Sequence, residues 1–141
     1  IVGRNVVNPG GLQFRGVVGT AVTKVCDLEV ARTGLSLMEA KRLGFEAITS
    51  TITASSRAGA YPGSQNITIT LILDKTSKRV LGAEMTGKEG VAKRIDIFAI
   101  ALHNQMTVHA LAQADLSYAP PFAPVWDPVL IAANVGIKKV S

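Results

Sequence analysis

The clearest pattern of hydrophobic and polar residues is the strict alternation over residues 66–74. Apolar side chains occupy every second position and share one side of an extended chain, namely Ile67, Ile69, Leu71 and Leu73. Thr68 and Thr70 fall on the opposite side. This period of two predicts a β-strand with one face in the protein core. The polar residues 75–78 predict a turn, after which residues 79–85 return as the hairpin partner of that strand.

Two earlier segments are rich in Val, Ile and Thr, the residue types that strands favour. Residues 17–28 predict one strand, and Cys26 lies in its alternating apolar pattern. Residues 45–54 predict another strand. The loop over residues 55–65 contains the triplet Tyr-Pro-Gly, whose Pro and Gly suit the second and third positions of a type II turn. That turn is expected to present Tyr61 at its start.

Apolar residues three or four positions apart predict the main helix over residues 91–105. Its apolar stripe consists of Val91, Ile95, Phe98, Ala99 and Leu102. The charged residues Lys93, Arg94 and Asp96 lie off that stripe. This stripe and a last apolar helix near the end of the chain, at residues 129–135, offer more apolar surface than one small sheet can cover. We therefore expect a homodimer.

Capping residues mark three shorter helices. A Ser and a Glu three positions apart form a capping box, which predicts a helix over residues 36–43 that stops at Gly44. A Thr is expected to cap a short helix over residues 107–114. An Asp-Pro pair predicts the start of a last apolar helix over residues 127–135, followed by a tail over residues 136–139.

The order of these elements is strand, short helix, strand, hairpin and then helices. It predicts an α+β fold, an antiparallel sheet with flanking helices on one side. Residues 1–15 have little periodicity and contain Asn-Pro-Gly-Gly, so we interpret them as the tail of a preceding domain and a linker. Residues 16–141 then form the folded domain. The chain starts at Ile1 without Met, and we expect it to be a piece of a longer protein.

Composition narrows the class of protein. Of the 141 residues, 48% are hydrophobic and 18% are charged, yet no apolar run approaches the length of a membrane span. The net charge of +5 is spread along the chain with few aromatic residues between the basic pairs, which argues against a nucleic-acid partner. A single cysteine excludes an internal disulfide and favours a reducing, cytoplasmic location.

The aromatic residues concentrate in residues 115–128. This segment holds Tyr118, Phe122 and Trp126 together with four prolines, although the whole chain is only 5% aromatic. Because a proline pushes the residue before it toward extended backbone, we expect a stiff, polyproline-like arm that holds Tyr118 and Phe122 in fixed directions. A well-packed connector is the other interpretation of this segment.

Few residues are candidates for chemistry. The alternating pattern around Cys26 favours a buried structural thiol. His103 and His109 have no Cys, Asp or Glu at metal-ligand spacing, so we expect no metal site. No G-x-G-x-x-G fingerprint is present, and we expect no cofactor bound by this chain alone. Tyr61 and Tyr118 are the two tyrosines of the chain, each in a segment that contains proline, and both structural and catalytic roles stay open for them.

Several motifs, in order along residues 16–136, carry a resemblance to a known family. They are the segments at residues 19–24, 29–35, 61–63, 87–96 and 118–122, which read GTAVTK, EVARTGL, YPG, GKEGVAKRID and YAPPF. These resemble the C-terminal dimerisation domain of pyridine nucleotide-disulfide oxidoreductases. The similar branch contains coenzyme A disulfide reductases, NADH oxidases and NADH peroxidases.

The resemblance implies an antiparallel sheet with flanking helices that forms a homodimer. It also implies FAD and NAD(P)H domains upstream in the same chain, with residues 1–15 as the tail of the FAD domain, and coenzyme A as a possible further ligand. The family's redox-active cysteine lies in that upstream part, so Cys26 does not match it. The tyrosines that match Tyr61 and Tyr118 act in trans in the partner subunit's active site. The resemblance further puts Tyr118 and Phe122 near the partner's flavin.

Two positions depart from the family's patterns. The dithiol branch carries a His-Pro followed by Glu as an acid–base pair, whereas His109 is followed by Ala110 here. Some coenzyme A disulfide reductases carry a Lys where Trp126 stands, and use it on the coenzyme A phosphate. Substrate binding at Trp126 is therefore open, as is the choice among coenzyme A disulfide, oxygen, peroxide and polysulfide. The alternative function is a self-standing small-molecule binding or interaction domain without redox activity.

Overall fold

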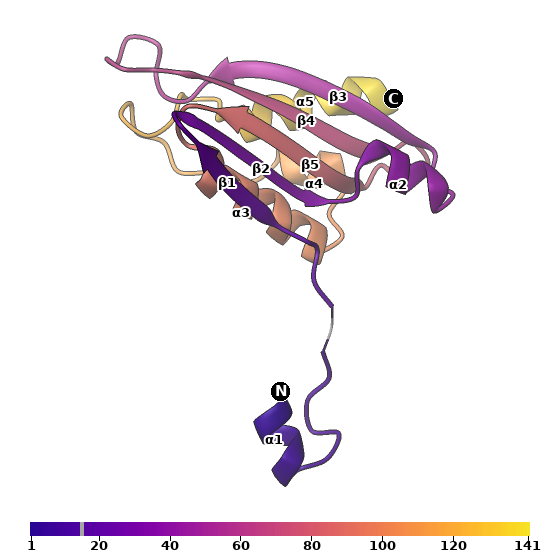
Figure 1. Cartoon of the computed structure of the whole chain (residues 1–141). Helices are drawn as coiled ribbons and strands as arrows, with labels where there is room; N and C mark the ends of the chain where they lie inside the picture. Colours follow the sequence, from indigo (N-terminus) through magenta and orange to yellow (C-terminus); the bar gives the residue numbers. More distant parts are fainter. Residues whose placement is uncertain (15) are drawn as a thin grey trace.

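The computed structural model describes residues 1–14 and 16–141, and in this part of the chain five strands form one antiparallel sheet (Figure 1). Along the chain the elements are α1 (Val2–Val7), β1 (Ala21–Val25), β2 (Leu28–Gly34), α2 (Leu37–Arg42), β3 (Ala47–Ser55), β4 (Asn66–Asp74), β5 (Val80–Gly87), α3 (Val91–His103), α4 (Val108–Ala112) and α5 (Pro128–Val140). The strand order is β1-β2-β5-β4-β3, with every neighbour antiparallel. The predicted α+β fold is confirmed.

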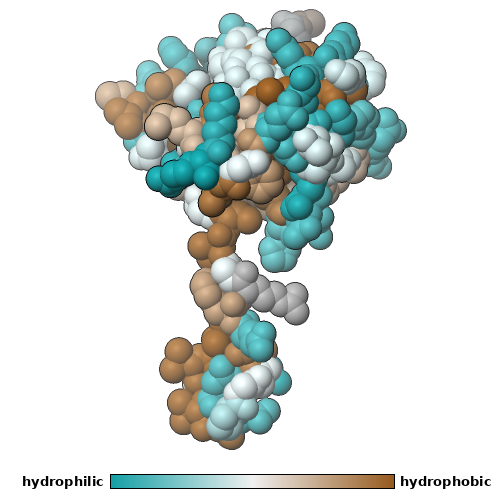
Figure 2. All heavy atoms as spheres, turned by 90° about the vertical axis from the view of Figure 1, so that its right-hand side faces the viewer, coloured by the Kyte–Doolittle hydropathy of each residue, from teal (hydrophilic) through white to brown (hydrophobic). Residues whose placement is uncertain are grey.

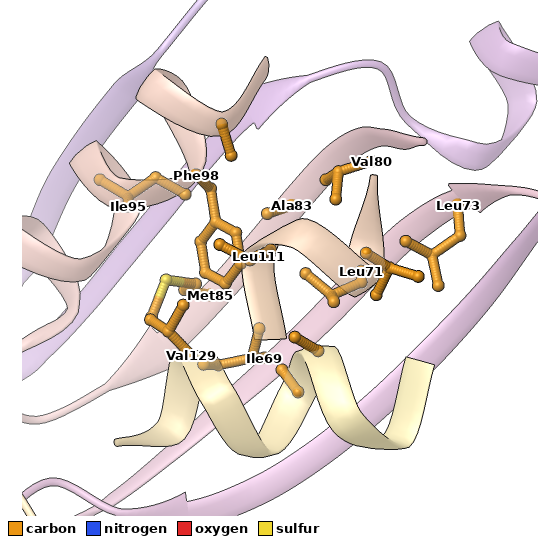
Figure 3. Close-up of a cluster of buried hydrophobic side chains, with 14 of the residues drawn as sticks. Ile69, Leu71, Leu73, Val80, Ala83, Met85, Ile95, Phe98, Leu111 and Val129 are labelled. Atoms are coloured by element: carbon orange, nitrogen blue, oxygen red, sulfur yellow. The ribbon is translucent and has the colours of Figure 1, made fainter. Parts of the chain in front are cut away.

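The predicted alternation along β4 is also confirmed. Its four inward residues, Ile67, Ile69, Leu71 and Leu73, are fully buried. On this face α3 lies over β2 and β5, and α5 lies over β3 and β4. Phe98 of α3 and Val129 of α5 meet the strands there, both fully buried (Figure 3). Tight apolar packing of this kind fixes the sheet against its helices.

The apolar stripe of α3 is used inside the chain. Val91, Ile95 and Phe98 are buried in the same cluster as the inward residues of β4. The stripe therefore does not need a second chain to cover it, and this basis for predicting a homodimer is wrong because the sheet covers the stripe. A dimer of this chain has to use other surfaces.

One helix lies on the other face of the sheet. Ala40 of α2 packs in a second, smaller cluster with Ala47, Ile72 and Leu81. Ile72 points away from the main core, since successive side chains of a strand alternate between faces and its neighbours Leu71 and Leu73 point inward. The prediction that all helices flank one side is thus wrong for α2.

Residues 17–28, predicted as one strand, include a hairpin turn instead. Strands β1 and β2 pair with Val25 opposite Leu28, so Cys26 and Asp27 form a two-residue turn. Cys26 is exposed and has a φ of 52°, a conformation that tight hairpin turns commonly give to Gly. The prediction of a buried thiol is wrong because the pairing of β1 with β2 puts Cys26 in the turn, and Cys-Asp lacks the glycine that marks most two-residue hairpin turns.

The last helix is longer than predicted. α5 continues through Gly136 to Val140, where the sequence indicated a tail from residue 136 onward. A Cβ at Gly136 would meet the side chains of Leu73 at 2.9 Å and Val108 at 3.1 Å. Glycine here permits close packing of α5 on β4 and α4, and does not end the helix.

Helix caps predicted from the sequence are confirmed, and one is supplied from far away in the chain. Ser36 and Glu39 form the capping box of α2, and Thr107 caps α4. The N-cap of α3 is Gly90, which has no side chain to accept a hydrogen bond. Glu29 of β2 replaces it, because its carboxylate accepts from the backbone N–H groups of residues 91 and 92 at 2.9 and 3.3 Å.

Helix α1 lies apart from the sheet (Figure 1) and has no buried residue. Figure 2 shows apolar side chains on α1 and on the segment that leads to β1. Val2, Val6 and Val7 are all exposed. The expected boundary between residues 15 and 16 falls at Arg15, which lies outside the described residues. No helix among residues 1–14 and 16–141 is long and apolar enough to span a membrane.

Candidate functional site

The Tyr61 loop, residues 56–65, connects β3 to β4 and is closed at its base by two hydrogen bonds. Ser56 donates its N–H to the carbonyl of Gln65 at 2.7 Å, and the Gln65 N–H donates to the Ser56 hydroxyl at 3.0 Å. Gly63 has a φ of 80°, as the third position of a type II turn requires, so this part of the turn prediction is confirmed. The Arg57 guanidinium lies over the Tyr61 ring, 5.9 Å from its centre.

The aromatic segment, residues 115–127, connects α4 to α5. Its Ala-Pro-Pro-Phe portion is a turn, because the carbonyl of Ala119 accepts from the N–H groups of Phe122 at 2.9 Å and Ala123 at 3.0 Å. Polyproline helices have no internal hydrogen bonds, so the prediction of a polyproline-like arm is wrong for this portion. The turn leaves the aromatic side chains in solvent: Phe122 is 79% exposed and Trp126 is 61% exposed.

The fold brings the two tyrosine-bearing segments together at one end of the sheet (Figure 1). The N–H of Ala58 in the Tyr61 loop donates to the carbonyl of Pro120 in the aromatic segment at 3.2 Å. Tyr61 is 39% exposed and Tyr118 is 52% exposed. Both phenols are thus on segments in direct backbone contact, and both are accessible from outside the chain.

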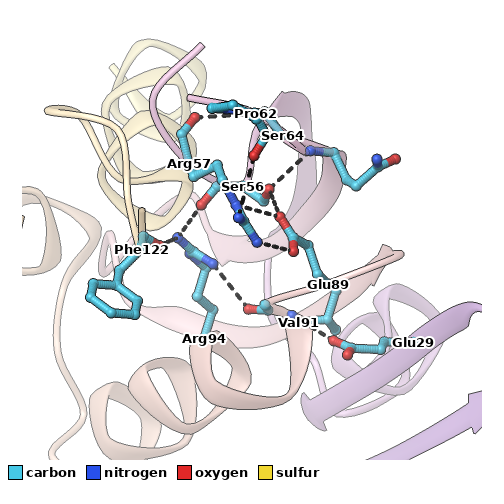
Figure 4. A network of polar contacts seen from close by, with 11 residues as sticks. Glu29, Ser56, Arg57, Pro62, Ser64, Glu89, Val91, Arg94 and Phe122 are labelled. Carbon is cyan, nitrogen blue, oxygen red and sulfur yellow. Dashed lines mark hydrogen bonds and ion pairs between the residues drawn. The ribbon is translucent and has the colours of Figure 1, made fainter. Parts of the chain in front are cut away.

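Arg94 joins these segments to the helices (Figure 4). Its Nη2 donates to the carbonyls of Ser56 at 2.9 Å and Phe122 at 3.2 Å, and its Nε donates to the carboxylate of Asp127 at 3.0–3.1 Å. Its Nη1 donates to the carbonyl of Gly90. Arg94 is only 8% exposed, so the pattern that put it off the apolar stripe did not indicate its position.

Sequence reasoning missed Arg94 because helical periodicity groups residues by hydropathy and not by distant partners. Asp127 was the available signal, since it was identified as an N-cap, and it does accept from the N–H of Val129 at 2.9 Å. The same carboxylate also neutralises a buried guanidinium 33 residues away. Buried charges of this kind are stable only when they are paired and hydrogen-bonded.

A second ion pair supports the base of the Tyr61 loop. The carboxylate of Glu89 accepts from the Ser56 hydroxyl and from Arg57, through Nε at 3.0 Å and through Nη2. The hydrogen bond from Ser56, followed by that from Arg57, holds the pKa of Glu89 below its ordinary value. Glu89 is therefore charged at neutral pH, and two guanidinium groups face two carboxylates at this end of the sheet.

The arrangement favours hydrogen-bond donation by phenols and offers little else for chemistry. A tyrosine hydroxyl is a neutral donor at pH 7, with a pKa of about 10 in water. Among the described residues, no group of three or more His, Cys, Asp or Glu side chains could hold a metal ion. The remaining predicted site residue, Trp126, lies just before α5 with its side chain exposed, and the described residues do not enclose it.

Comparison with known proteins identifies the family. Residues 20–128 match the family model of the pyridine nucleotide-disulphide oxidoreductase dimerisation domain. The chain belongs to this family. In this dimerisation domain the motifs GKEGVAKRID and YAPPF are now seen to meet, because Arg94 of the first binds the carbonyl of Phe122 in the second.

Individual relatives of the domain are longer oxidoreductases. An NAD(P)H coenzyme A polysulfide/persulfide reductase of Pyrococcus horikoshii is 42% identical over 135 residues, which are 96% of this chain and 30% of that protein. A coenzyme A disulfide reductase of Staphylococcus aureus is 31% identical over 87% of this chain and 28% of that protein. An NADH oxidase of Methanocaldococcus jannaschii is 34% identical over the whole chain and 31% of that protein. The chain thus spans less than a third of the length of these relatives.

A solved structure shares the fold closely. The NAD-dependent persulfide reductase from A. fulgidus superimposes with a TM-score of 0.94 and 40% sequence identity, covering 98% of this chain and 26% of that chain. The dimerisation domain described here therefore corresponds to about a quarter of that structure.

Proposed function

We propose that this domain contributes Tyr61 and Tyr118 to the active site of a partner subunit, in an FAD-dependent NAD(P)H oxidoreductase of the coenzyme A disulfide reductase and NADH oxidase type. The observation that carries the proposal is the pairing of two exposed tyrosines on segments in direct contact. They are the two tyrosines of the chain. The names of the relatives, which include coenzyme A disulfide reductase and persulfide reductase, indicate the class of substrate.

The proposed chemistry is stabilisation of a leaving thiolate. A disulfide or persulfide S–S bond breaks when it accepts an electron pair, and one sulfur departs as a thiolate. A phenol O–H that donates a hydrogen bond to this sulfur stabilises charge that is larger in the transition state than in the substrate. Two phenols on segments that contact each other allow two such donors at the same sulfur. Reduced flavin supplies the electrons when it is bound.

The residues present fit a contact with the flavin ring but not the binding of a whole dinucleotide. Exposed aromatic rings such as Phe122 and Tyr118 suit the edge or face of a planar ring system. The start of α3 does not offer a pyrophosphate site, because the Glu29 carboxylate already accepts from its free N–H groups. The pyrophosphate of FAD and the whole of NAD(P)H are therefore assigned to upstream domains of the same chain.

A homodimer is part of the same proposal, and the surface that supports it is the aromatic segment instead of the stripe of α3. The exposed residues of the aromatic segment, Tyr118, Phe122, Val125 and Trp126, form apolar surface that the described part of the chain leaves uncovered. Trp126 is proposed to contact substrate or partner there. The exposed valines of α1 favour residues 1–15 as the tail of the FAD domain, packed on that domain. Because this chain has a single cysteine and so no internal disulfide, the protein is proposed to work in the reducing cytoplasm.

The test is Tyr61→Phe and Tyr118→Phe in the full-length oxidoreductase that contains this domain. Each change removes one donor and keeps the ring, so turnover of coenzyme A disulfide is expected to fall about ten- to a thousandfold. Flavin content and sedimentation as a dimer should not change. Thr76→Val is the matched control, since it removes a hydroxyl in the β4–β5 turn at the other end of β4. Wild-type turnover in both Phe variants would contradict the proposal and mean that the tyrosines serve only in packing.

A further inference from the structure

Every donor nitrogen of Arg94 has an acceptor, and the acceptors come from four separate parts of the chain. They are the carbonyl of Ser56 at the base of the Tyr61 loop, the carbonyl of Phe122 in the aromatic segment, the carbonyl of Gly90 before α3, and the carboxylate of Asp127 before α5. The first two share one nitrogen, Nη2. A single atom thus sets the spacing between the two segments that carry the tyrosines.

The guanidinium is itself fixed in direction. Asp127 binds it at Nε and Nη2, with an ion-pair distance of 2.9 Å, and this carboxylate is held in turn as the N-cap of α5. Gly90 has a φ of 76°, and a Cβ at this position would collide with Nη1 of Arg94. Glycine here is therefore needed both for the backbone conformation and for the space that the guanidinium occupies.

Lysine cannot reproduce this arrangement. Its ammonium is one point with three donors on a flexible stem, whereas the guanidinium is a planar fork with five donors in fixed directions. A lysine at position 94 can still pair with Asp127. It cannot at the same time reach Gly90 from one side and bridge the carbonyls of Ser56 and Phe122 from the other.

We propose that Arg94 is a positioning residue for catalysis: it fixes the relative placement of the Tyr61 and Tyr118 hydroxyls by holding their two segments on one guanidinium nitrogen. This inference rests on the proposed role of the two tyrosines. Arg94 is buried, so it acts through those segments and does not touch substrate itself. The contact between Ala58 and Pro120 is a second, weaker tie between the same segments.

The first experiment measures position without activity. In the full-length oxidoreductase labelled with 3-fluorotyrosine, loss of one ¹⁹F NMR signal in Tyr61→Phe and of another in Tyr118→Phe assigns one signal to each segment. Arg94→Lys is expected to shift and broaden both signals. Arg32→Lys is the matched control. Arg32 also pairs with a carboxylate, that of Glu39 at 3.4 Å, but it lies on β2 and not beside the tyrosine segments. It should move neither signal.

A second control separates positioning from a general loss of stability. Ile72→Val removes a methylene-sized group from the small cluster under α2 and lowers stability without touching the tyrosine segments. Positioning by Arg94 is contradicted if Arg94→Lys leaves both fluorine signals in place. It is equally contradicted if Ile72→Val moves them as far as Arg94→Lys does.

The second experiment is a double-mutant cycle in the full-length oxidoreductase. Arg94→Lys is expected to lower kcat for disulfide about ten- to a hundredfold, as misplacement of catalytic groups by about 1 Å does, with KM for NAD(P)H unchanged. In the Tyr61→Phe/Tyr118→Phe background the same change should have no further effect on kcat, since no hydroxyl is left to position.

The outcomes distinguish the two proposals. An equal loss of kcat from Arg94→Lys in both backgrounds overturns the positioning role. Wild-type turnover of the double Phe variant overturns the proposed function of the tyrosines, and the fluorine spectra then still decide whether Arg94 fixes their placement.

Discussion

The core of this domain and its tyrosine end, which consists of the Tyr61 loop and the aromatic segment, are stabilised differently. In the core, side chains such as Phe98 and Leu71 pack against one another and are fully buried. At the tyrosine end, Arg94 binds backbone carbonyls of irregular segments, and the aromatic side chains of those segments stay exposed. Fixing a segment by its backbone leaves its side chains free to contact something outside the chain. This is the arrangement that a domain needs if it donates side chains to a partner's site.

The largest expected effect is on the core. Phe98→Ala should lower the free energy of unfolding by about 3–5 kcal/mol, because it removes a fully buried ring and leaves a cavity. Urea denaturation followed by circular dichroism measures this change. Met38→Ala, on the exposed side of α2 with Met38 82% exposed, should change it by less than about 0.5 kcal/mol. Similar losses in the two variants would mean that the core is not where stability concentrates.

The next effect concerns the buried ion pair at the tyrosine end. Asp127→Asn keeps a side chain that can cap α5 but leaves the guanidinium of Arg94 buried without a counter-charge. We expect a loss of about 3 kcal/mol in the free energy of unfolding, the lower end for breaking a buried pair. Asp96→Asn breaks the exposed pair with Lys93 and should cost about 0.5 kcal/mol or less. Equal losses would show that burial of Arg94 does not raise the contribution of its ion pair to the free energy of unfolding.

A smaller effect is expected where the two regions join, at the start of α3. Glu29→Gln weakens the acceptor for the N–H groups of Val91 and Ala92 and removes a negative charge near the helix N-terminus. The free energy of unfolding should fall by about 1 kcal/mol, the usual value of a helix cap. Glu46→Gln, at an exposed pair with Lys75, is the control and should have less effect. Hydrogen exchange of the first turn of α3 should rise in the Glu29 variant alone.

The smallest effect is a dependence on pH. The folded pKa of Glu89 lies below its ordinary value of 4.5, through the hydrogen bonds from Ser56 and Arg57. Its contribution to stability is therefore complete above that ordinary value and is lost as the pH falls through the lower, folded pKa. Ser56→Ala should reduce the acid-induced loss of stability, measured by urea denaturation at a series of pH values. An unchanged acid profile would mean that Ser56 does not perturb Glu89.

Much of the fold could be predicted from local patterns. The period of two placed β4 correctly, and Ser36 with Glu39 gave a helix start that the structure confirms. Local patterns failed where a distant contact decides the outcome. Gly136 looks like a helix end, yet it lies inside α5, because the helix packs closely on β4 at this point. Cys26 looks like a strand residue, yet the pairing of β1 with β2 puts it in a turn.

For the candidate site, the two tyrosines could be predicted from the sequence, but the residue that fixes their segments could not. Tyr61 and Tyr118 stand out because each lies in a segment that contains proline, in a chain with few aromatic residues. Arg94 does not stand out, because charged residues are common on the polar face of an amphipathic helix. Apart from Gly90, the hydrogen-bond partners of Arg94 are 28 to 38 residues away in the sequence. A short stretch of sequence around Arg94 therefore does not show which groups it binds.

The sequence by itself determined most of the helices and strands, the inward face of β4, the helix caps near in sequence, and the family. These depend on residues a few positions apart, whose side chains meet as soon as a helix or strand forms. The tertiary structure alone decided that Arg94 is buried, that Glu29 caps α3, and that the Tyr61 loop meets the aromatic segment. Each of these depends on a buried charge or a free backbone group finding its partner across the fold, and only the packed chain brings those partners within hydrogen-bond distance.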